Sequence, residues 1–304
     1  MHEAIGKTWL EVALNGAWTR QRQPGIPITV AEIVEQGIAC VKAGASIVHV
    51  HAYDEETGQQ KDDPELYARI IEGIRSKVDA IVYPTVPAAG LNRIDGASTA
   101  EQRYAHIEKL AKSGLLEWAV VDPGSCNFAH YDDLKEDKPG FVYVNSEEDI
   151  RHGLQLARRY RFHPGYAIYE PGFARLGASL HWRESCPDPV YRLMFSRGFA
   201  FGFPPEDYGL TAYLNLLDQV APGCNWMIAG LDVDVLPLVP RAVMERGHVR
   251  VGLEDAPFGC ERGNVALVEE AAGLIEKAGG TLAVGADVRI ACSAEALEAA
   301  SGHA

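Results

Sequence analysis

The chain has 304 residues, of which 47% are hydrophobic, and a formal net charge of −14 at pH 7. This composition supports one large core and excludes a surface built for nucleic acid or anionic membrane, since those partners require a basic face. The sequence contains no long uncharged apolar stretch and no Cys-x-x-Cys pair among its six cysteines, so we expect a soluble, cytoplasmic protein with reduced thiols.

Short apolar segments of strand character alternate with amphipathic helical segments along the chain. The predicted strands are residues 9–14, 46–51, 80–84, 117–121, 165–169, 197–202, 225–229 and 248–253. Helix starts are marked by the Thr29-Val30-Ala31-Glu32 capping box and by Asp63-Pro64. Eight strands in a chain of this length favour a (β/α)8 TIM barrel of the α/β class. An open dinucleotide-binding sheet is disfavoured because no glycine-rich turn follows the first strand.

No linker-like stretch divides the sequence, so we expect a single (β/α)8 barrel domain over residues 1–304. Residues 173–194 are polar and have no clear period. This segment predicts an irregular insertion in the barrel, of the kind that forms lids or subunit contacts.

His49 and His51 lie at the end of the second predicted strand, two residues apart. Alternate residues of a strand share one face, so both imidazoles can bind one ion. Glu254 follows the eighth predicted strand, and the C-terminal ends of barrel strands meet at the active-site face. Two neutral nitrogens and one carboxylate suit Zn²⁺ or a similar divalent ion with an open coordination position.

Arg250 and Asp255 flank this carboxylate in the Arg250-Val251-Gly252-Leu253-Glu254-Asp255 segment. Arg250 shares the face of Gly252 and Glu254, so its guanidinium can point into the barrel and hold a substrate carboxylate or orient an acid. The alternative is a structural Arg–Asp ion pair.

Polar residues also follow the other early strands. They are Asn15, Thr85, Asp122 and Glu170. A group of polar strand ends is what a small polar substrate needs at the active-site face, although each residue alone could be a loop cap.

Several segments together resemble the β-keto acid cleavage enzymes, whose type member is the 3-keto-5-aminohexanoate cleavage enzyme. They are Val48-His49-Val50-His51, Pro27 to Ile33, Ala43-Gly44-Ala45, Tyr169-Glu170-Pro171-Gly172 and, above all, Arg250 to Asp255. The resemblance implies a zinc-dependent barrel that converts a β-keto acid and acetyl-CoA into acetoacetate and a new acyl-CoA.

The same resemblance implies zinc on His49, His51 and Glu254, with Arg250 and Asp255 as a guanidinium-assisted base. It also implies Thr85 at the substrate carboxylate, Glu170 as a further polar contact and a homotetramer. The family commonly has a glutamate where this chain has Trp18. An indole removes the partner of a substrate amine, so an apolar or neutral acyl tail is favoured, and a quaternary ammonium on the ring is the alternative.

Two alternative functions would use the same residues. Metal-dependent amidohydrolases also carry a His-x-His pair, but they need two further histidines at middle strand ends, for which His163 and His181 are the available candidates. A non-catalytic barrel that only binds an acidic metabolite would lack a base, whereas Asp255 and Arg250 are both present.

Overall fold

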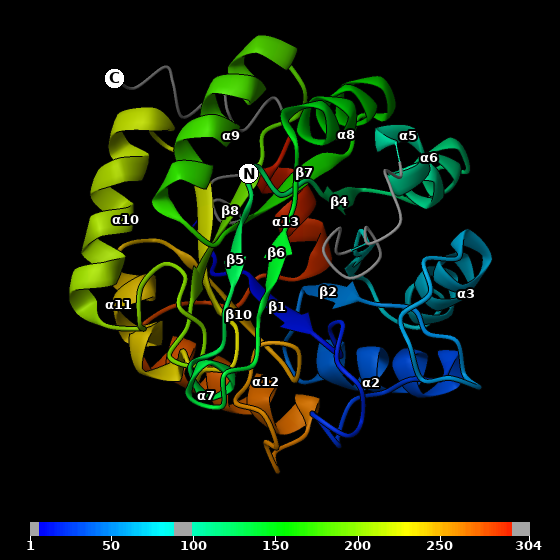
Figure 1. Cartoon of the computed structure of the whole chain (residues 1–304), viewed down its shortest axis with the longest axis horizontal. Coiled ribbons are helices and arrows are strands. Elements are labelled where there is room, and N and C mark those ends of the chain that lie inside the picture. Colours follow the sequence, from blue (N-terminus) through cyan, green and yellow to red (C-terminus); the bar gives the residue numbers. More distant parts are fainter. Residues whose placement is uncertain (1–5, 88–98, 294–304) are drawn as a thin grey trace.

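The computed structural model describes residues 6–87 and 99–293, and it forms the predicted parallel barrel (Figure 1). The order of the eight strands in the sheet is β3-β2-β1-β10-β9-β8-β7-β4. The edge strands β3 and β4 contact each other and nearly close the barrel. The strands are β1 (Leu10–Ala13), β2 (Ile47–Val50), β3 (Ile81–Pro84), β4 (Trp118–Val120), β7 (His163–Ile168), β8 (Val190–Phe195), β9 (Asn225–Gly230) and β10 (His248–Val251).

Helices surround the strands, as Figure 1 shows. They are α2 (Val30–Lys42), α3 (Pro64–Arg75), α5 (Ala100–Arg103), α6 (Ala105–Lys112), α8 (Glu147–Tyr160), α9 (Pro171–Glu184), α10 (Asp207–Val220), the 3-10 turn η2 (Leu236–Leu238), α11 (Val239–Met244), α12 (Asn264–Lys277) and α13 (Gly285–Ala291). Within the described ranges, no helix has the length and apolarity needed to cross a membrane.

Local sequence signals account for the helix starts. The Thr29 side chain accepts a hydrogen bond from the Glu32 amide, and the Glu32 carboxylate accepts one from the Thr29 amide. Asp63 caps α3 by accepting from the Glu65 amide, with Pro64 at the first helical position. Each cap satisfies amides that the first turn leaves without partners. The predicted capping box and N-cap are therefore confirmed.

The prediction of an irregular insertion over residues 173–194 is wrong, because this range holds most of α9 and of β8. The buried face of α9 combines Phe173 and Leu180 with the small residues Ala174 and Gly177, while Leu176 and Trp182 are exposed, so the apolar period of the helix is weak. The sixth barrel strand is β8, not residues 197–202. Its charged Arg192 interrupts an otherwise apolar run, although all six residues of the strand are buried.

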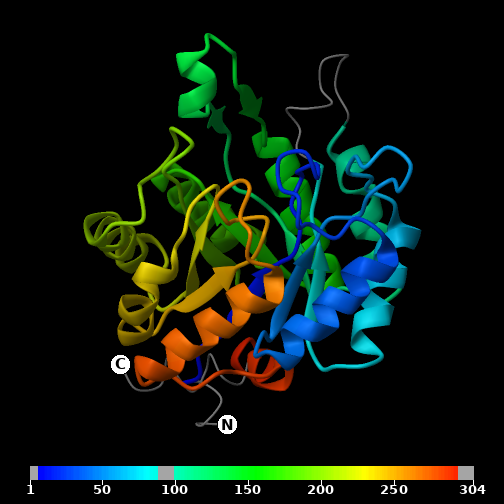
Figure 2. The same cartoon turned by 90° about the horizontal axis from the view of Figure 1, so that it is seen from below.

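An excursion after β4 was not predicted. It contains β5 (Cys126–Phe128), the short helix α7 (Tyr131–Lys135) and β6 (Phe141–Tyr143), with β5 and β6 paired antiparallel. In Figure 2 this green segment extends beyond one end of the barrel. Its Phe128 and Tyr143 belong to an apolar cluster separate from the main core, so the excursion forms a second layer above the strand ends.

Candidate active site

A cavity of about 380 Å³ opens at the C-terminal ends of the barrel strands. Its volume is within the usual range of small-molecule sites, roughly 300 to 1,000 Å³. The polar side chains that line it include those of His49, His51, Thr85, Asp122, Arg192, Arg250 and Glu254. Side chains distant in the sequence therefore meet at the end of the barrel where catalysis is usual.

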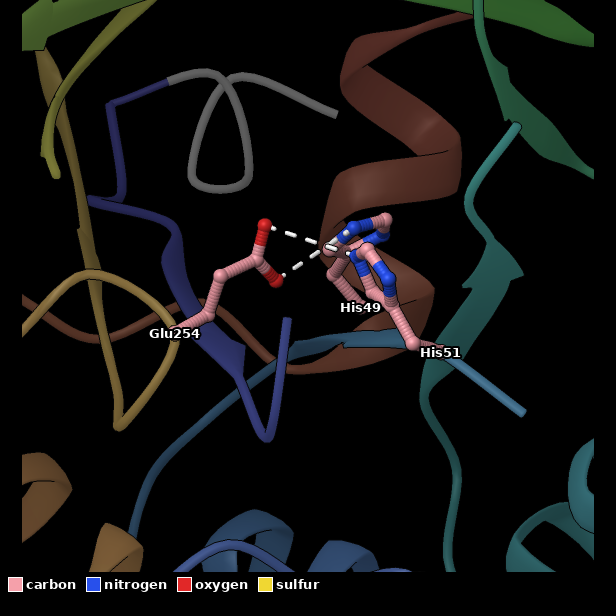
Figure 3. A group of neighbouring side chains, drawn as sticks. All are labelled: His49, His51 and Glu254. Carbon is pink, nitrogen blue, oxygen red and sulfur yellow. Dashed lines mark ion pairs between the residues drawn. The ribbon is translucent and has the colours of Figure 1, made fainter. Parts of the chain in front are cut away.

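His49, His51 and Glu254 form the centre of this site (Figure 3). Nε2 of His49 lies 3.5 Å from Oε2 of Glu254, and Nε2 of His51 lies 3.5 Å from Oε1 of the same carboxylate. One ligand atom from each residue lies within 4.8 Å of the others. The three donors predicted from the sequence therefore converge on one point.

Unsatisfied polar atoms indicate that this cluster fits a cation. Nε2 of His51, Nδ1 of His49 and Oε2 of Glu254 are buried and have no hydrogen-bond partner among the described residues. Buried polar atoms are normally paired, because an unpaired group costs about 1 to 3 kcal/mol. Burial also lowers the pKa of His49 well below its usual value, and the neutral imidazole is the form that binds a metal.

Gln60 orients the second histidine. Its Oε1 lies 2.9 Å from Nδ1 of His51, and its amide nitrogen donates to Asp62 at 3.0 Å. With Oε1 as the acceptor, His51 carries its proton on Nδ1 and presents a free lone pair on Nε2. This outer hydrogen bond is typical of metal-binding histidines.

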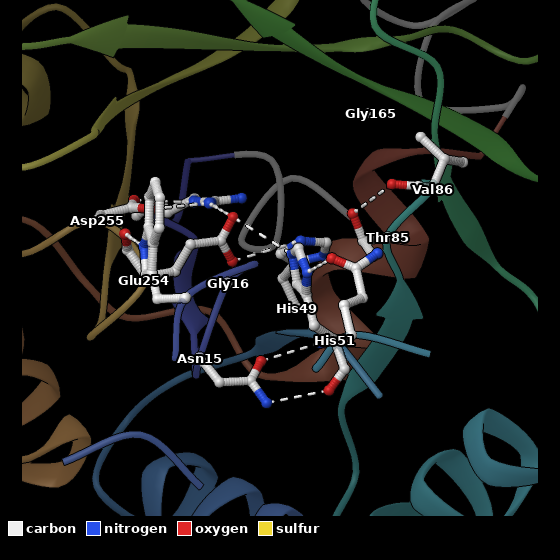
Figure 4. Close-up of polar contacts among 12 residues, drawn as sticks. Asn15, Gly16, His49, His51, Thr85, Val86, Gly165, Glu254 and Asp255 are labelled. Atoms are coloured by element: carbon white, nitrogen blue, oxygen red, sulfur yellow. Dashed lines mark hydrogen bonds and ion pairs between the residues drawn. The ribbon is translucent and has the colours of Figure 1, made fainter. Parts of the chain in front are cut away.

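Asn15 holds the backbone of the same histidine, as Figure 4 shows. Its Oδ1 accepts from the His51 amide at 2.9 Å, and its Nδ2 donates to the His51 and Pro27 carbonyls at 3.0 Å each. Asn15 does not line the cavity. The Asn15 side chain therefore positions His51, a candidate metal ligand, and its contact with substrate stays a prediction.

Arg250 and Asp255 form a buried bidentate pair. Nε and Nη2 of Arg250 donate to Oδ2 and Oδ1 of Asp255 at 2.9 and 2.7 Å, and Nη2 also lies 3.0 Å from Oε1 of Glu254. Arg250 lines the cavity, whereas Asp255 lies behind it. Burial raises the pKa of Asp255 to about 6, which brings this carboxyl close to the range useful for proton transfer at neutral pH.

A buried ionic layer beneath the cavity joins Arg250 to Glu11, Tyr83 and Arg192. Glu11 accepts hydrogen bonds from the Tyr83 hydroxyl at 2.6 Å and from Nη1 of Arg250 at 3.2 Å. Nη1 of Arg192 donates to the Tyr83 hydroxyl at 2.9 Å. Sequence reasoning missed Arg192, because the sixth strand was predicted at residues 197–202.

Of the other residues predicted to bind substrate, three line the cavity and one does not. Thr85 and Asp122 line the cavity, but Asp122 is already engaged by the Tyr143 hydroxyl at 2.6 Å and the Ala167 amide at 2.7 Å. Trp18 also lines the cavity, and its Nε1 donates to the Glu254 carbonyl at 2.8 Å. Glu170 precedes α9 as its half-buried N-cap and is not among the lining residues.

The amidohydrolase alternative needs histidines that this cavity lacks among the described residues. His163 begins β7, at the opposite end of the strand from the site, and its Nδ1 contacts the Asp188 carbonyl. His181 lies on α9 and contacts the Cys186 carbonyl. Neither lines the cavity.

Comparisons with known proteins match most of the chain. A family model described as beta-keto acid cleavage enzyme matches residues 7–292. The 3-oxoadipate:acetyl-CoA acetyltransferase of Cupriavidus necator is 28% identical over 300 residues, covering 95% of each chain. The 3-dehydrocarnitine:acetyl-CoA trimethylamine transferase of Rhizobium meliloti is 25% identical over 303 residues, covering 93% of this chain and 95% of that one.

Solved structures show the same fold. The apo structure of ObcA superposes with a TM-score of 0.68 at 17% identity, covering 88% of this chain and 65% of the ObcA chain. The likeness concerns the barrel alone.

Proposed function

Because the chain belongs to the β-keto acid cleavage enzyme family and is an acyltransferase of β-keto acids, we propose that its reaction is the one the family resemblance implies. A β-keto acid and acetyl-CoA are converted into acetoacetate and the acyl-CoA of the original keto group. The convergence of His49, His51 and Glu254 beside the Arg250–Asp255 pair is the observation that supports this proposal.

The reaction balances as an exchange of acyl groups. C2 of the β-keto acid loses a proton and forms a bond to the acetyl carbon, and the acetyl C–S bond breaks. The CoA thiolate then attacks the original keto carbon, the old C2–C3 bond breaks, and C2 regains a proton. The products are acetoacetate and the new acyl-CoA.

The donor set of His49, His51 and Glu254 fits Zn²⁺. When bound, the ion would supply Lewis-acid stabilisation of the negative charge that develops on the substrate oxygens.

The protein's own residues account for the proton and for substrate orientation. The Arg250 guanidinium faces the cavity, and the Asp255 carboxylate lies behind it and accepts two of its N–H groups. Arg250 can therefore take the C2 proton as it passes one of its own protons to Asp255. Thr85 and the buried Nε–H of Arg192, which has no hydrogen-bond partner among the described residues, are the groups available to hold the substrate carboxylate.

The direct test supplies the enzyme with a β-keto acid and acetyl-CoA labelled with ¹³C in the acetyl group. We expect the label in the acetyl half of acetoacetate and an unlabelled new acyl-CoA, both measured by mass spectrometry. Hydrolysis of either reactant without label in acetoacetate would contradict the proposed reaction.

A further inference from the structure

The cavity has two chemically different sides. His49, His51, Arg250 and Glu254 come from β2 and from β10 with the turn that follows it, the strands that flank β1. The other side comes from β4, β7, β8, the end of β9 and the excursion after β4. Its apolar members, called here the apolar wall, are Val120, Phe128, Phe141, Ala167, Met194 and Leu231.

The apolar wall is well packed and mostly independent of the barrel core. Five of its six members are buried, and most belong to the second apolar cluster. The ring of Phe128 lies 4.9 Å from that of Tyr169 and 5.1 Å from that of Phe141, measured between centroids. Interlocked aromatic rings form a stiff surface, so a ligand group placed against it must be apolar to replace the water there.

Carboxylates that could pair with a cationic ligand group are already engaged. Asp122 and Glu254 are the carboxylates among the described lining residues. Asp122 accepts hydrogen bonds from the Tyr143 hydroxyl and the Ala167 amide and lies 3.6 Å from Arg192. Glu254 is one of the three candidate metal ligands and pairs with Arg250. An ammonium group in this cavity would lack a counter-ion.

The Trp18 ring, which lines the cavity, and the neighbouring Phe258 ring are covered by a cation. The Arg22 guanidinium carbon lies 4.2 Å from the centroid of the Phe258 ring and 5.5 Å from that of Trp18. A quaternary ammonium at these rings would have to compete with Arg22 for the same electron-rich faces.

An anionic tail would also be poorly matched. The six side chains of the apolar wall contain no hydrogen-bond donor. The cationic side chains among the described lining residues have other roles. Arg250 pairs with Asp255, and Arg22 lies 4.0 Å from Asp133. Arg192 donates to Tyr83 and to the Gly165 carbonyl at 2.9 and 3.0 Å, which leaves its Nε–H for the reacting carboxylate. Burying an unpaired charge costs far more than burying a hydrocarbon gains.

We infer that the acyl tail of the substrate lies against the apolar wall and is therefore uncharged and apolar, as in a β-keto acid with an alkyl or phenyl tail. This inference rests on the proposed function, and it specifies the substrate class. The reacting keto group faces His49, His51 and Glu254, the carboxylate lies by Thr85 and the Arg192 Nε–H, and the tail points toward Phe128 and Phe141.

The first test compares kcat/KM for β-keto acids that differ only in the tail. The tails are propyl, phenyl, carboxylate, primary ammonium and trimethylammonium. We expect kcat/KM for the apolar tails to exceed that for each charged tail by at least about thirtyfold, because burying even a neutral polar group without a partner has a cost of this size. A preference for any charged tail, or equal rates with all five, overturns the inference.

A second measurement separates this inference from the proposed function. Calorimetry of the same five acids, without acetyl-CoA, reports the tail preference whether or not turnover occurs. Tight binding of the apolar acids without formation of acetoacetate would support the tail site and contradict the proposed reaction. Formation of acetoacetate with the charged tails preferred would support the proposed reaction and contradict the apolar tail site.

A variant on the hairpin places a charge in the apolar wall. Phe141→Lys puts an ammonium beside the tail, and we expect the ratio of carboxylate-tail to propyl-tail kcat/KM to rise by at least about tenfold. Val142→Lys is the matched control, because Val142 is the next residue of the same strand and is 49% exposed. Equal ratios in the two variants overturn the inference, and the wild-type comparisons decide the matter if Phe141→Lys does not fold.

Discussion

At the scale of single residues, the candidate metal ligands are held by polar side chains behind them. Asn15 holds the His51 backbone, and Gln60 holds its imidazole. Such outer partners fix the ring orientation and the position of the proton, so we expect them to raise the metal affinity of the candidate ligands.

Gln60→Leu removes the acceptor of the His51 Nδ1 proton while keeping a similar side-chain volume. We expect the apparent zinc affinity, measured by competition with a chromophoric chelator, to fall about 10- to 100-fold. Gln59→Leu is the control, because Gln59 is exposed and adjacent in the chain. Equal zinc affinities in the two variants would show that Gln60 does not support the site.

Asp255→Asn tests the proposed base. The amide keeps the shape of the side chain but cannot take up the proton, so we expect kcat to fall by about 10² to 10⁴. Metal content, measured by elemental analysis, should remain at the wild-type level because Asp255 is not among the three clustered ligands. An unchanged kcat would remove Asp255 from this role.

At the scale of elements, the turn after β10 sets the position of both acids. Gly252 has φ of +137°, and a Cβ added there would lie 2.1 Å from the Ala13 carbonyl oxygen. This close approach lets the Glu254 amide donate to the same Ala13 carbonyl. Only glycine combines this backbone conformation with so short a distance to β1.

Gly252→Ala should therefore displace the turn. We expect a loss of about 3 kcal/mol or more in the free energy of unfolding, measured in urea, together with loss of bound metal. Gly273→Ala is the control, since Gly273 lies on the exposed face of α12 with no neighbouring atom within 4 Å of a new Cβ. That variant should gain about 0.5 to 1 kcal/mol. Retained metal and stability in Gly252→Ala would contradict this account.

At the scale of the whole molecule, a buried histidine makes the barrel sensitive to acid. His248 begins β10, stacks on Trp9 with ring centroids 4.0 Å apart, and accepts a hydrogen bond from the Trp9 amide. Burial lowers the pKa of His248 from 6.5 to about 3. Below pH 6.5 His248 is protonated in the unfolded chain but stays neutral in the folded barrel, so the free energy of unfolding falls as the pH falls toward 3.

His248→Asn keeps an acceptor for the Trp9 amide and removes the titration. Between pH 7 and about pH 4.5, wild type should lose about 2 to 3 kcal/mol more unfolding free energy than the variant. Urea unfolding at both pH values measures the difference. Parallel pH dependences in the two proteins would show that His248 is not responsible.

The sequence by itself determined the barrel, the grouping of His49, His51 and Glu254, and the Arg250–Asp255 pair. Strand and helix periods, capping residues and the alternation of His49 and His51 are local patterns, and strand ends of a parallel barrel must meet at one face. The family resemblance, carried by the same local segments, is confirmed by the match over residues 7–292.

Only the tertiary structure decided the rest of the cavity. Arg192 lies in the middle of β8, and its charge interrupts the apolar run by which that strand could be predicted. Its partners Glu11 and Tyr83 come from β1 and β3. The apolar wall combines residues of several strands with a hairpin that no local period predicts. Asn15 is polar at a strand end like the others, but its contacts turn it toward His51. Such roles depend on contacts between distant segments, which no local pattern encodes.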